Sequence, residues 1–298
     1  MSAPGRVVAY RFAGGLGNRM FQLMLAHVLA ERIPDLAVTG PPLPEWGIAP
    51  PDLPLPPRRI RLAGHEVDLA RLSYLLGAGI VDGIETEALG CRMELLSRPL
   101  AQRLFPALMH AGVATAPDEL VINIRAAEIL GPVHPGYRPL PLAFYARLIA
   151  ETGLKPVFVG QLGEDRYSAA LRARFPAARI IPSASPMQDF ATLRAARHLV
   201  VAVSTFSWLA AWLSEAETIH LPLAGVLHPG LRRDVDLVPL GDPRWRFHLF
   251  PAAGWGGTAA ELDAAIDGSE AGREATRDEV AQLAAPDLLL GAAETGAS

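Results

Sequence analysis

The chain has 298 residues, 50% of them hydrophobic, which is enough to bury a large core in one big or two medium domains. A formal charge of −4, with no long basic cluster, argues against nucleic acid as a partner. Glycine and proline, 27 each, stay below the combined level of roughly 25–30% that marks low complexity, so a globular protein is expected.

The single cysteine, Cys91, cannot form an internal disulfide and is expected to be a small buried residue in a reducing cytoplasm. Arg6 and Arg11 interrupt any apolar run near the N-terminus, so no signal peptide is expected. The longest apolar stretch, 198–213, contains three hydroxyl residues and is shorter than the ~20 residues that cross a bilayer. We therefore expect a soluble cytoplasmic protein, for which a place beside a membrane surface stays open.

The first elements are a short β-like run over 7–10, a glycine turn and a helix that begins near Asn18. This order gathers backbone N–H groups at a helix N-terminus, where anions bind. Many α/β proteins need glycine there only for packing, which is the simpler explanation of the turn taken alone. The helix ends near Pro34, and 36–39 is predicted to be a second strand.

Residues 41–57 carry eight prolines, which exclude a regular helix and predict a surface loop that serves as a connector. The N-terminal half continues with predicted strands at 58–62 and 79–84 and predicted helices at 68–76 and 91–105. A weakly patterned piece at 109–117 marks a boundary, so we expect one domain over 1–116 and another over 117–298.

From residue 119 onward, strands alternate with helices of about ten residues, which predicts parallel βαβ units. The predicted strands are 119–124, 156–160, 178–181, 198–203 and 218–221, and the predicted helices are 142–151, 166–175, 186–196 and 206–215. Beyond Pro251, surface helices are expected at 261–266 and 277–283, with fraying over the last dozen residues.

Ligands of parallel α/β sheets bind at the carboxyl ends of the strands, and three of these ends carry polar residues. The first is the glycine turn with Asn18. The second holds Asn123 and Arg125, which strand alternation puts on one face. The third is Ser204 with Thr205 at a helix start, where hydroxyl residues are often only N-caps.

Arg125 directly follows an apolar strand, so its guanidinium needs an anionic partner, either Glu128 or a bound phosphate. Backbone donors, a guanidinium and two hydroxyls that face one cleft suit a diphosphate leaving group, because fixed donors stabilise the charge that builds on its oxygens. No Asp-x-Asp pair ends a strand. We therefore expect no metal ion and no other cofactor.

Two stretches closely resemble signature motifs of the α-1,2-fucosyltransferase family, namely 14–22 (GGLGNRMFQ) and 203–213 (VSTFSWLAAWL). Their order and separation match as well, so the similarity spans roughly 7–251. It implies an α/β, glycosyltransferase-B-like fold with two Rossmann-like parallel-sheet domains that face a cleft. It also implies inverting, metal-independent transfer of fucose from GDP-fucose to a galactoside hydroxyl, in an α-1,2 linkage, during polysaccharide or glycan synthesis.

The resemblance also implies roles for single positions. It places four residues against the donor phosphates and sugar, namely Gly14, Gly15, Gly17 and Asn18. It places four more on the other side of the diphosphate, namely Ser204, Thr205, Phe206 and Ser207. Asp189 matches an acidic position that accepts hydrogen bonds from guanine. Two positions depart from the motifs, since Arg19 stands where Gln is usual and Leu209 where a second Trp is common.

The central motif differs most. Family members typically read His-x-Arg-Arg-Gly-Asp, whereas this chain reads Asn123-Ile124-Arg125-Ala126-Ala127-Glu128. Arg125 keeps the phosphate-binding position, Asn123 is expected to bind the donor in place of His, and Glu128 keeps a carboxylate that can act as general base. The lost second Arg removes a charged contact worth roughly 1.5–3 kcal/mol. This change indicates a subfamily with altered substrate preference or weakened activity.

Two other functions stay open, namely a transferase of the same fold that uses another nucleotide sugar and a non-catalytic relative that binds a sugar nucleotide or glycan. A nicotinamide-dependent enzyme is disfavoured, because the third glycine of the G-x-G-x-x-G fingerprint is missing and no acidic residue ends the second strand.

Four aromatic or histidine positions are weighed against simpler roles. In the proline loop, Trp46 offers a surface on which an acceptor sugar could stack, as an alternative to the connector role. A solvated loop position is the simpler reading of His134, which an acceptor could otherwise contact. Trp208 and Trp212, four residues apart on one helix, are expected in the core. Tyr137, Tyr145 and Tyr167 carry no signal in the sequence.

Overall fold

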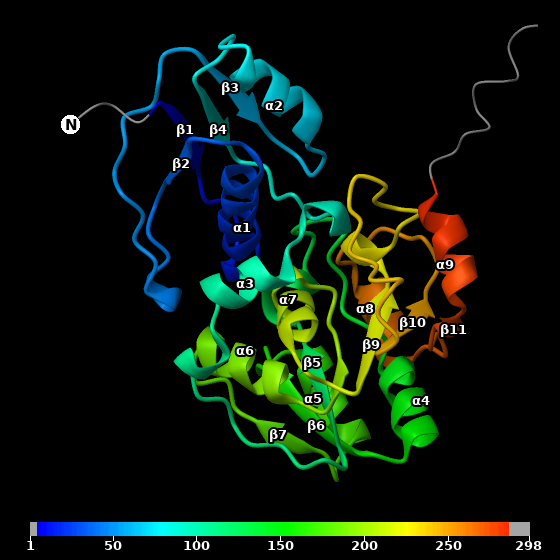
Figure 1. The fold of residues 1–298 in the computed structure, drawn as a ribbon. Coiled ribbons are helices and arrows are strands. Elements are labelled where there is room, and N and C mark those ends of the chain that lie inside the picture. The colour runs from blue at the N-terminus through cyan, green and yellow to red at the C-terminus, as the bar shows by residue number, and fades with distance from the viewer. Residues whose placement is uncertain (1–4, 286–298) are drawn as a thin grey trace, which may run out of the picture.

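The strands of the protein form two sheets, shown one above the other in Figure 1. The computed structural model describes residues 5–285, so the expected fraying of the last dozen residues lies outside the described part. Strands of the first sheet fall between residues 6 and 86, and strands of the second between 119 and 275. The expected α/β fold, with two parallel sheets facing a cleft, is confirmed.

The first sheet has the strand order β2-β1-β4-β3, and all of its pairs are parallel. Its strands are β1 (Arg6–Tyr10), β2 (Leu36–Thr39), β3 (Arg59–Leu62) and β4 (Gly83–Thr86), and its helices are α1 (Leu16–Arg32) and α2 (Leu69–Gly77). Alternate strand residues such as Val8 and Ile84 are fully buried in the core that α1 covers. The carboxyl end of β1 therefore leads straight into the glycine turn and α1.

The second sheet has the order β11-β10-β9-β8-β5-β6-β7. Its strands are β5 (Glu119–Ile124), β6 (Lys155–Gly160), β7 (Arg179–Ile181), β8 (His198–Val200), β9 (Thr218–Leu223), β10 (Trp245–Leu249) and β11 (Arg273–Ala275). Only β11 is antiparallel to its neighbour. Taken in chain order, the six parallel strands run 3-2-1-4-5-6 across the sheet, which is the Rossmann order.

The helices of this half are α4 (Leu142–Thr152), α5 (Arg166–Arg174), α6 (Pro186–Ala195), α7 (Thr205–Leu213), α8 (Ala259–Asp267) and α9 (Arg277–Ala284). The two halves join through α1, α7 and α3 (Arg98–Leu104), which pack on one another. The Phe21 ring of α1 lies 5.9 Å from Trp208 of α7, and Trp208 stacks on Trp212 at 5.7 Å. Both tryptophans and Cys91 are buried, as predicted.

Four elements differ from the sequence prediction. The expected helix at 91–105 is a 3-10 turn, Met93–Leu95, followed by α3, because Ser97 caps a new helix whose first turn holds Pro99. The strand expected at 79–84 begins only at Gly83, since Gly79 takes a left-handed φ of 65° just after α2. The prediction also missed β10 and β11, which extend the second sheet.

Trp46 corrects one expectation. Its side chain is only 4% exposed, and its ring lies 5.2 Å from Phe105, 5.6 Å from Phe190 and 5.1 Å from His110. The proline-rich loop therefore inserts this indole into the core between the two halves. It offers no surface to an acceptor sugar, and the connector role is the correct one.

Within residues 5–285, no helix combines the length and apolar character needed to span a membrane.

A buried histidine pair makes the second sheet sensitive to acid. His220 Nδ1 lies 2.9 Å from His248 Nε2, and Arg147 Nη2 lies 3.0 Å from His248 Nδ1. Burial, together with the nearby Arg147 charge, lowers the pKa of His220 to about 4 and lowers that of His248 as well. As the pH falls, the unfolded chain therefore takes up these protons before the folded chain does. The stability that the neutral pair provides is complete above pH 6.5 and is lost as the pH falls below it.

We expect the free energy of unfolding to drop by about 1.4 kcal/mol per pH unit for each histidine between pH 6.5 and 5. Urea unfolding at several pH values measures this slope. A folded His220→Gln variant should show a flatter slope than the wild type. An unchanged slope in this variant would contradict the assignment.

Candidate active site

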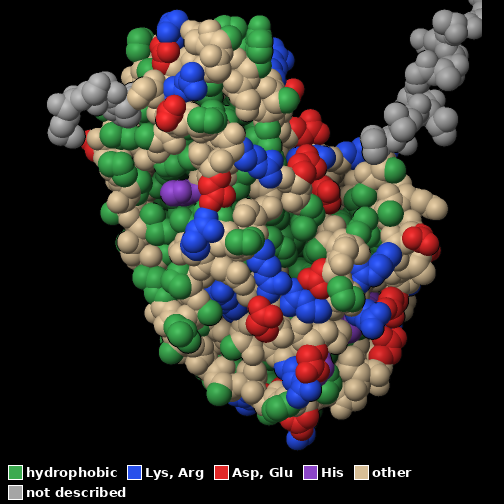
Figure 2. All heavy atoms as spheres, viewed as in Figure 1, with side chains coloured by type: hydrophobic (Ala, Val, Ile, Leu, Met, Phe, Trp, Pro, Cys, Tyr) green, Lys and Arg blue, Asp and Glu red, His purple; other side chains and the backbone are tan. Residues whose placement is uncertain are grey.

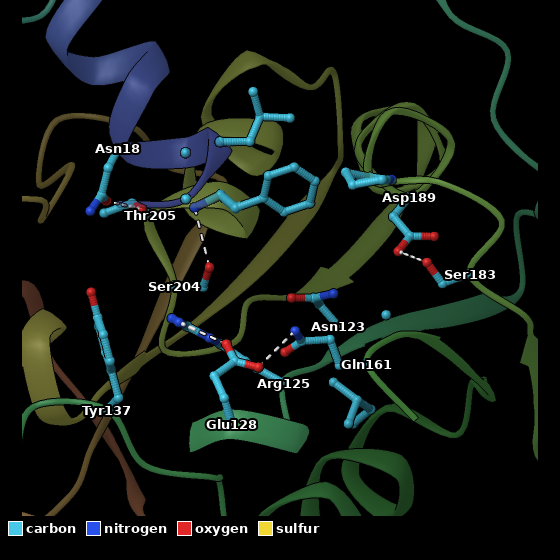
Figure 3. Close-up of a pocket in the computed structure, with 17 residues that line it drawn as sticks. Asn18, Asn123, Arg125, Glu128, Tyr137, Gln161, Ser183, Asp189, Ser204 and Thr205 are labelled. Carbon is cyan, nitrogen blue, oxygen red and sulfur yellow. Dashed lines mark hydrogen bonds and ion pairs between the residues drawn. The ribbon is translucent and has the colours of Figure 1, made fainter. Parts of the chain in front are cut away.

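A pocket of about 380 Å³ opens where the two halves meet. Figure 2 shows one face of the molecule, over which Lys, Arg, Asp and Glu side chains are scattered among hydrophobic ones. The pocket has a size typical of small-molecule sites, roughly 300–1,000 Å³. Its polar lining is drawn in Figure 3 and comprises Asn18, Asn123, Arg125, Glu128, Tyr137, Gln161, Ser183, Asp189, Ser204 and Thr205.

The topology explains why these residues meet. Strands β5 and β8 are neighbours in the sheet, but the chain leaves β5 toward β6 on one side and reaches β8 only after α6. Such a reversal of strand order leaves a crevice at the carboxyl ends of the strands, where ligands bind in open α/β sheets. Asn123 and Arg125 end β5, and Ser204 and Thr205 follow β8. The glycine turn after β1 closes the crevice from the first sheet.

The N-termini of α1 and α7 touch at the pocket. A Cβ atom added to Gly17 would lie 2.5 Å from the backbone nitrogen of Phe206 and 2.7 Å from Thr205 Oγ1. Only glycine allows this approach. Beside it, Thr205 Oγ1 donates a hydrogen bond to Asn18 Oδ1 at 2.8 Å. Both helices thus direct the positive ends of their dipoles into one cavity.

The donors at these helix starts differ in availability. Gly15 is the N-cap of α1 and has no side chain to occupy the first-turn N–H groups. Ser204 Oγ accepts from the Phe206 N–H at 3.2 Å, so its own hydroxyl proton can still reach a ligand. The Thr205 proton is directed to Asn18 instead. Thr205 therefore joins the two halves in addition to lining the pocket.

Arg125 supplies the positive side chain of the pocket. Its Nη1 donates to the Val203 carbonyl at 3.2 Å, its Nη2 lies 3.6 Å from Glu128 Oε1, and its guanidinium carbon lies 4.3 Å from the centre of the Tyr137 ring. The side chain is 21% exposed. Of the two partners expected from the sequence, the structure shows Glu128, at a distance that leaves the guanidinium able to bind an anion.

Glu128 stands at the rim of the pocket. Ala127 before it takes a left-handed φ of 54° that starts a 3-10 turn over Ala127–Leu130, and this turn brings the carboxylate back toward Arg125. Glu128 Oε2 accepts a hydrogen bond from Gln161 Nε2 at 3.1 Å, and its side chain is 51% exposed. A carboxylate with this exposure can take up a proton and pass it to water.

The opposite end of the pocket accepts hydrogen bonds. Asp189 lies in the first turn of α6, is 7% exposed, and accepts from the Ser183 hydroxyl at 2.6 Å. Burial raises the pKa of Asp189. Asn123 uses its amide nitrogen to donate to the Val159 carbonyl at 3.1 Å, which leaves its amide oxygen for a ligand.

Most of the residues expected at the site line this one pocket. They are Gly15, Gly17, Asn18, Asn123, Arg125, Glu128, Asp189, Ser204, Thr205 and Phe206. Phe206 packs edge-on against Phe190, with ring centres 5.3 Å apart. Gly14 lies outside the lining and, at a φ of 80°, sits against the Asn18 side chain that it helps to place.

Ser207 is a correction. Its side chain is fully buried and its hydroxyl donates to the Ala202 and Ser204 carbonyls at 3.3 and 3.4 Å. Because a helix turns by about 100° per residue, a position two residues after Thr205 points into the core rather than the pocket. Ser207 therefore has no contact to offer a diphosphate.

Three polar lining residues were not predicted from the sequence, namely Tyr137, Gln161 and Ser183. Gln161 directly follows β6, and Ser183 comes two residues after β7, so the rule of polar residues at strand ends could have found both. Tyr137 lies in a turn 12 residues after Arg125, and no periodicity marks it.

Among residues 5–285, no group of three or more His, Cys, Asp or Glu side chains is arranged to hold a metal ion.

No family model and no curated protein sequence matches the chain. The solved structures that are similar in fold include the following two. One is a mutant of FUT1 from Arabidopsis thaliana in complex with GDP, with 15% identity over 73% of this chain and 71% of that chain and a TM-score of 0.45. The other is a glycosyl transferase family 9 protein from Veillonella parvula DSM 2008, with 11% identity over 95% and 97% and a TM-score of 0.47. At these sequence identities and TM-scores, neither structure indicates the function of this chain.

Proposed function

We propose that the protein is an inverting, metal-independent glycosyltransferase that moves fucose from GDP-fucose to a hydroxyl of a galactoside acceptor, forming an α-1,2 linkage in polysaccharide or glycan synthesis. The motifs at 14–22 and 203–213, which resemble those of α-1,2-fucosyltransferases, support the donor and the linkage. Their positions Gly17, Asn18, Ser204 and Thr205 line a single pocket, where such a reaction needs them.

The observation that carries the proposal is the opposite polarity of the two ends of this pocket. Arg125 and the N-termini of α1 and α7 offer positive charge and N–H donors at one end, which suits a diphosphate. Asp189, which lies away from Arg125 in Figure 3, offers a buried carboxylate acceptor at the other end, which suits a base rich in donors. Guanine presents two adjacent N–H donors to a carboxylate, whereas adenine lacks the 2-amino group.

The chemistry follows from this placement. The acceptor hydroxyl attacks the anomeric carbon from the face opposite the diphosphate, the carbon–oxygen bond to the β-phosphate breaks, and GDP leaves with the electron pair. Arg125 and the two helix N-termini stabilise the charge that develops on the departing phosphate. Glu128 takes the acceptor proton and is the general base of the proposal.

The experiment compares nucleotides and then products. Thermal unfolding with excess GDP, ADP, UDP or dTDP should show the largest rise in melting temperature with GDP, because a ligand that binds only the folded state stabilises it. GDP-fucose and a panel of β-galactosides, with and without EDTA, should then give a fucosylated product by mass spectrometry. GDP binding without GDP release would identify a non-catalytic binder.

One observation favours a second candidate, a transferase of the same fold with another sugar nucleotide. Ala126 stands where the related motif has its second Arg, and it is fully buried, so this position offers a donor neither charge nor contact. A larger thermal shift with UDP, dTDP or ADP than with GDP would select this candidate over the fucosyltransferase.

A further inference from the structure

Arg125 is enclosed by two segments of one loop. The loop leaves β5, turns at Ala127, and returns with Tyr137 directly against the guanidinium, 4.3 Å from ring centre to guanidinium carbon. Glu128 Oε1 lies near Nη2 of the guanidinium, and the Val203 carbonyl accepts a hydrogen bond from Nη1. Figure 3 shows the Tyr137 side chain standing beside Arg125, with its hydroxyl pointing toward Asn18.

We propose that Tyr137 is a positioning residue, whose ring holds the Arg125 guanidinium in the orientation that binds the diphosphate. The inference rests on the proposed function and names a residue that the sequence motifs do not contain. An arginine side chain loses rotamer entropy when it is fixed, so one that is restrained before the ligand arrives binds more tightly. A cation over an aromatic face provides that restraint and keeps the N–H edges free for phosphate.

The turn that carries Tyr137 is itself rigid. The Tyr137 N–H donates to the His134 carbonyl at 2.9 Å, and the two rings lie 4.9 Å apart. Gly136 is buried, donates to His134 Nδ1 at 3.0 Å and accepts at its carbonyl from the Val226 N–H at 2.8 Å. His134 therefore supports this turn. The ring of Tyr137 reaches Arg125 from a backbone that is hydrogen-bonded to the 3-10 turn Gly225–Leu227, which follows β9.

The contact between Tyr137 and Arg125 matters more in this pocket because its lining contains one guanidinium. Among the lining residues of the described chain, Arg125 is the only Arg or Lys, and Ala126 is buried where the related motif has its second Arg. When a single cation must stabilise the leaving group, its orientation sets a large part of the phosphate affinity. Glu128 competes for that cation, and the ring on the other side limits how far the guanidinium can follow it.

The test measures the dissociation constants of GDP and of inorganic pyrophosphate by calorimetry. Tyr137→Leu, and Tyr137→Gln as a second variant should the first not fold, should weaken both ligands about 5- to 30-fold, the range of a partly desolvated cation–π contact. Tyr137→Phe keeps the ring and should bind like the wild type. Tyr74→Leu, altered at a tyrosine that is 67% exposed on α2, is the matched control.

A double-mutant cycle separates positioning from a merely structural effect. In the Arg125→Ala background, Tyr137→Leu should cause no further loss of affinity, because the group it positions is gone. An additive loss, or wild-type affinity in folded Tyr137→Leu, would overturn the positioning role of Tyr137 and leave the proposed function standing. Wild-type protein that binds pyrophosphate but not GDP would overturn only the proposed donor, and protein that binds neither would overturn both.

Discussion

In the proposed transfer of fucose from GDP-fucose, replacement of Arg125 by alanine should lower the turnover by about 10²–10³-fold while the protein remains folded. The guanidinium is the only positive side chain among the described pocket residues, so the developing phosphate charge would be left to the helix N-termini alone. The turnover of Arg125→Lys should lie between that of the wild type and that of Arg125→Ala. Lysine keeps the charge but loses the bidentate geometry and the stacking on Tyr137. The rate of GDP release measures the effect.

Arg71→Ala is the control for this substitution, because Arg71 is exposed on α2, away from the pocket lining. Its turnover should equal that of the wild type. A folded Arg125→Ala enzyme with unchanged turnover would remove Arg125 from the mechanism.

Replacement of Gly17 by alanine should destabilise the protein by about 1–3 kcal/mol and weaken GDP binding about 3- to 30-fold. The added methyl group would meet backbone atoms of α7 at 2.5 and 2.7 Å, and backbone cannot turn aside as a flexible side chain can. The N-termini of α1 and α7 must then separate, which moves two sets of phosphate donors at once. Chemical denaturation and nucleotide titration measure the two effects.

Gly77→Ala provides the comparison. Gly77 ends α2, and a Cβ atom there would meet nothing within 4 Å. Alanine favours helix over glycine by about 1 kcal/mol, so this variant should be as stable as the wild type or more so. If Gly17→Ala proved equally harmless, the close contact between α1 and α7 would not describe the protein in solution.

Much of the fold could be predicted from the sequence because local signals agreed with the global topology. Strand β5 was predicted with its bounds, since its apolar run is flanked by polar residues and its parallel neighbours cover it. In the segment 91–105 the periodicity was helical, but Ser97 and Pro99 start a new helix there. Strands β10 and β11 were missed because Arg246 and His248 interrupt the apolar residues of the first, and the second is a three-residue edge strand that begins with two charged residues.

The site could be predicted in outline, because the carboxyl ends of parallel strands meet at one edge. This rule brought Asn18, Arg125 and Thr205 together correctly across more than 180 residues of chain. It could not place Tyr137, whose position depends on how a loop folds back, or Trp46, whose burial depends on contacts between the two halves. Both are tertiary effects that no local pattern encodes.

The hydrogen bond between Thr205 and Asn18 joins residues 187 positions apart, and Gly17 fits beside it with no space to spare. The floor of the pocket is therefore built from residues of both halves, and neither half contains it alone. A chimera that combines the N-terminal half of this protein with the C-terminal half of another protein of the same fold keeps the floor of the pocket only if both parents have matching residues at these positions. Changing ligand specificity by swapping halves should thus require residues 17, 18 and 205 to be transplanted as one unit.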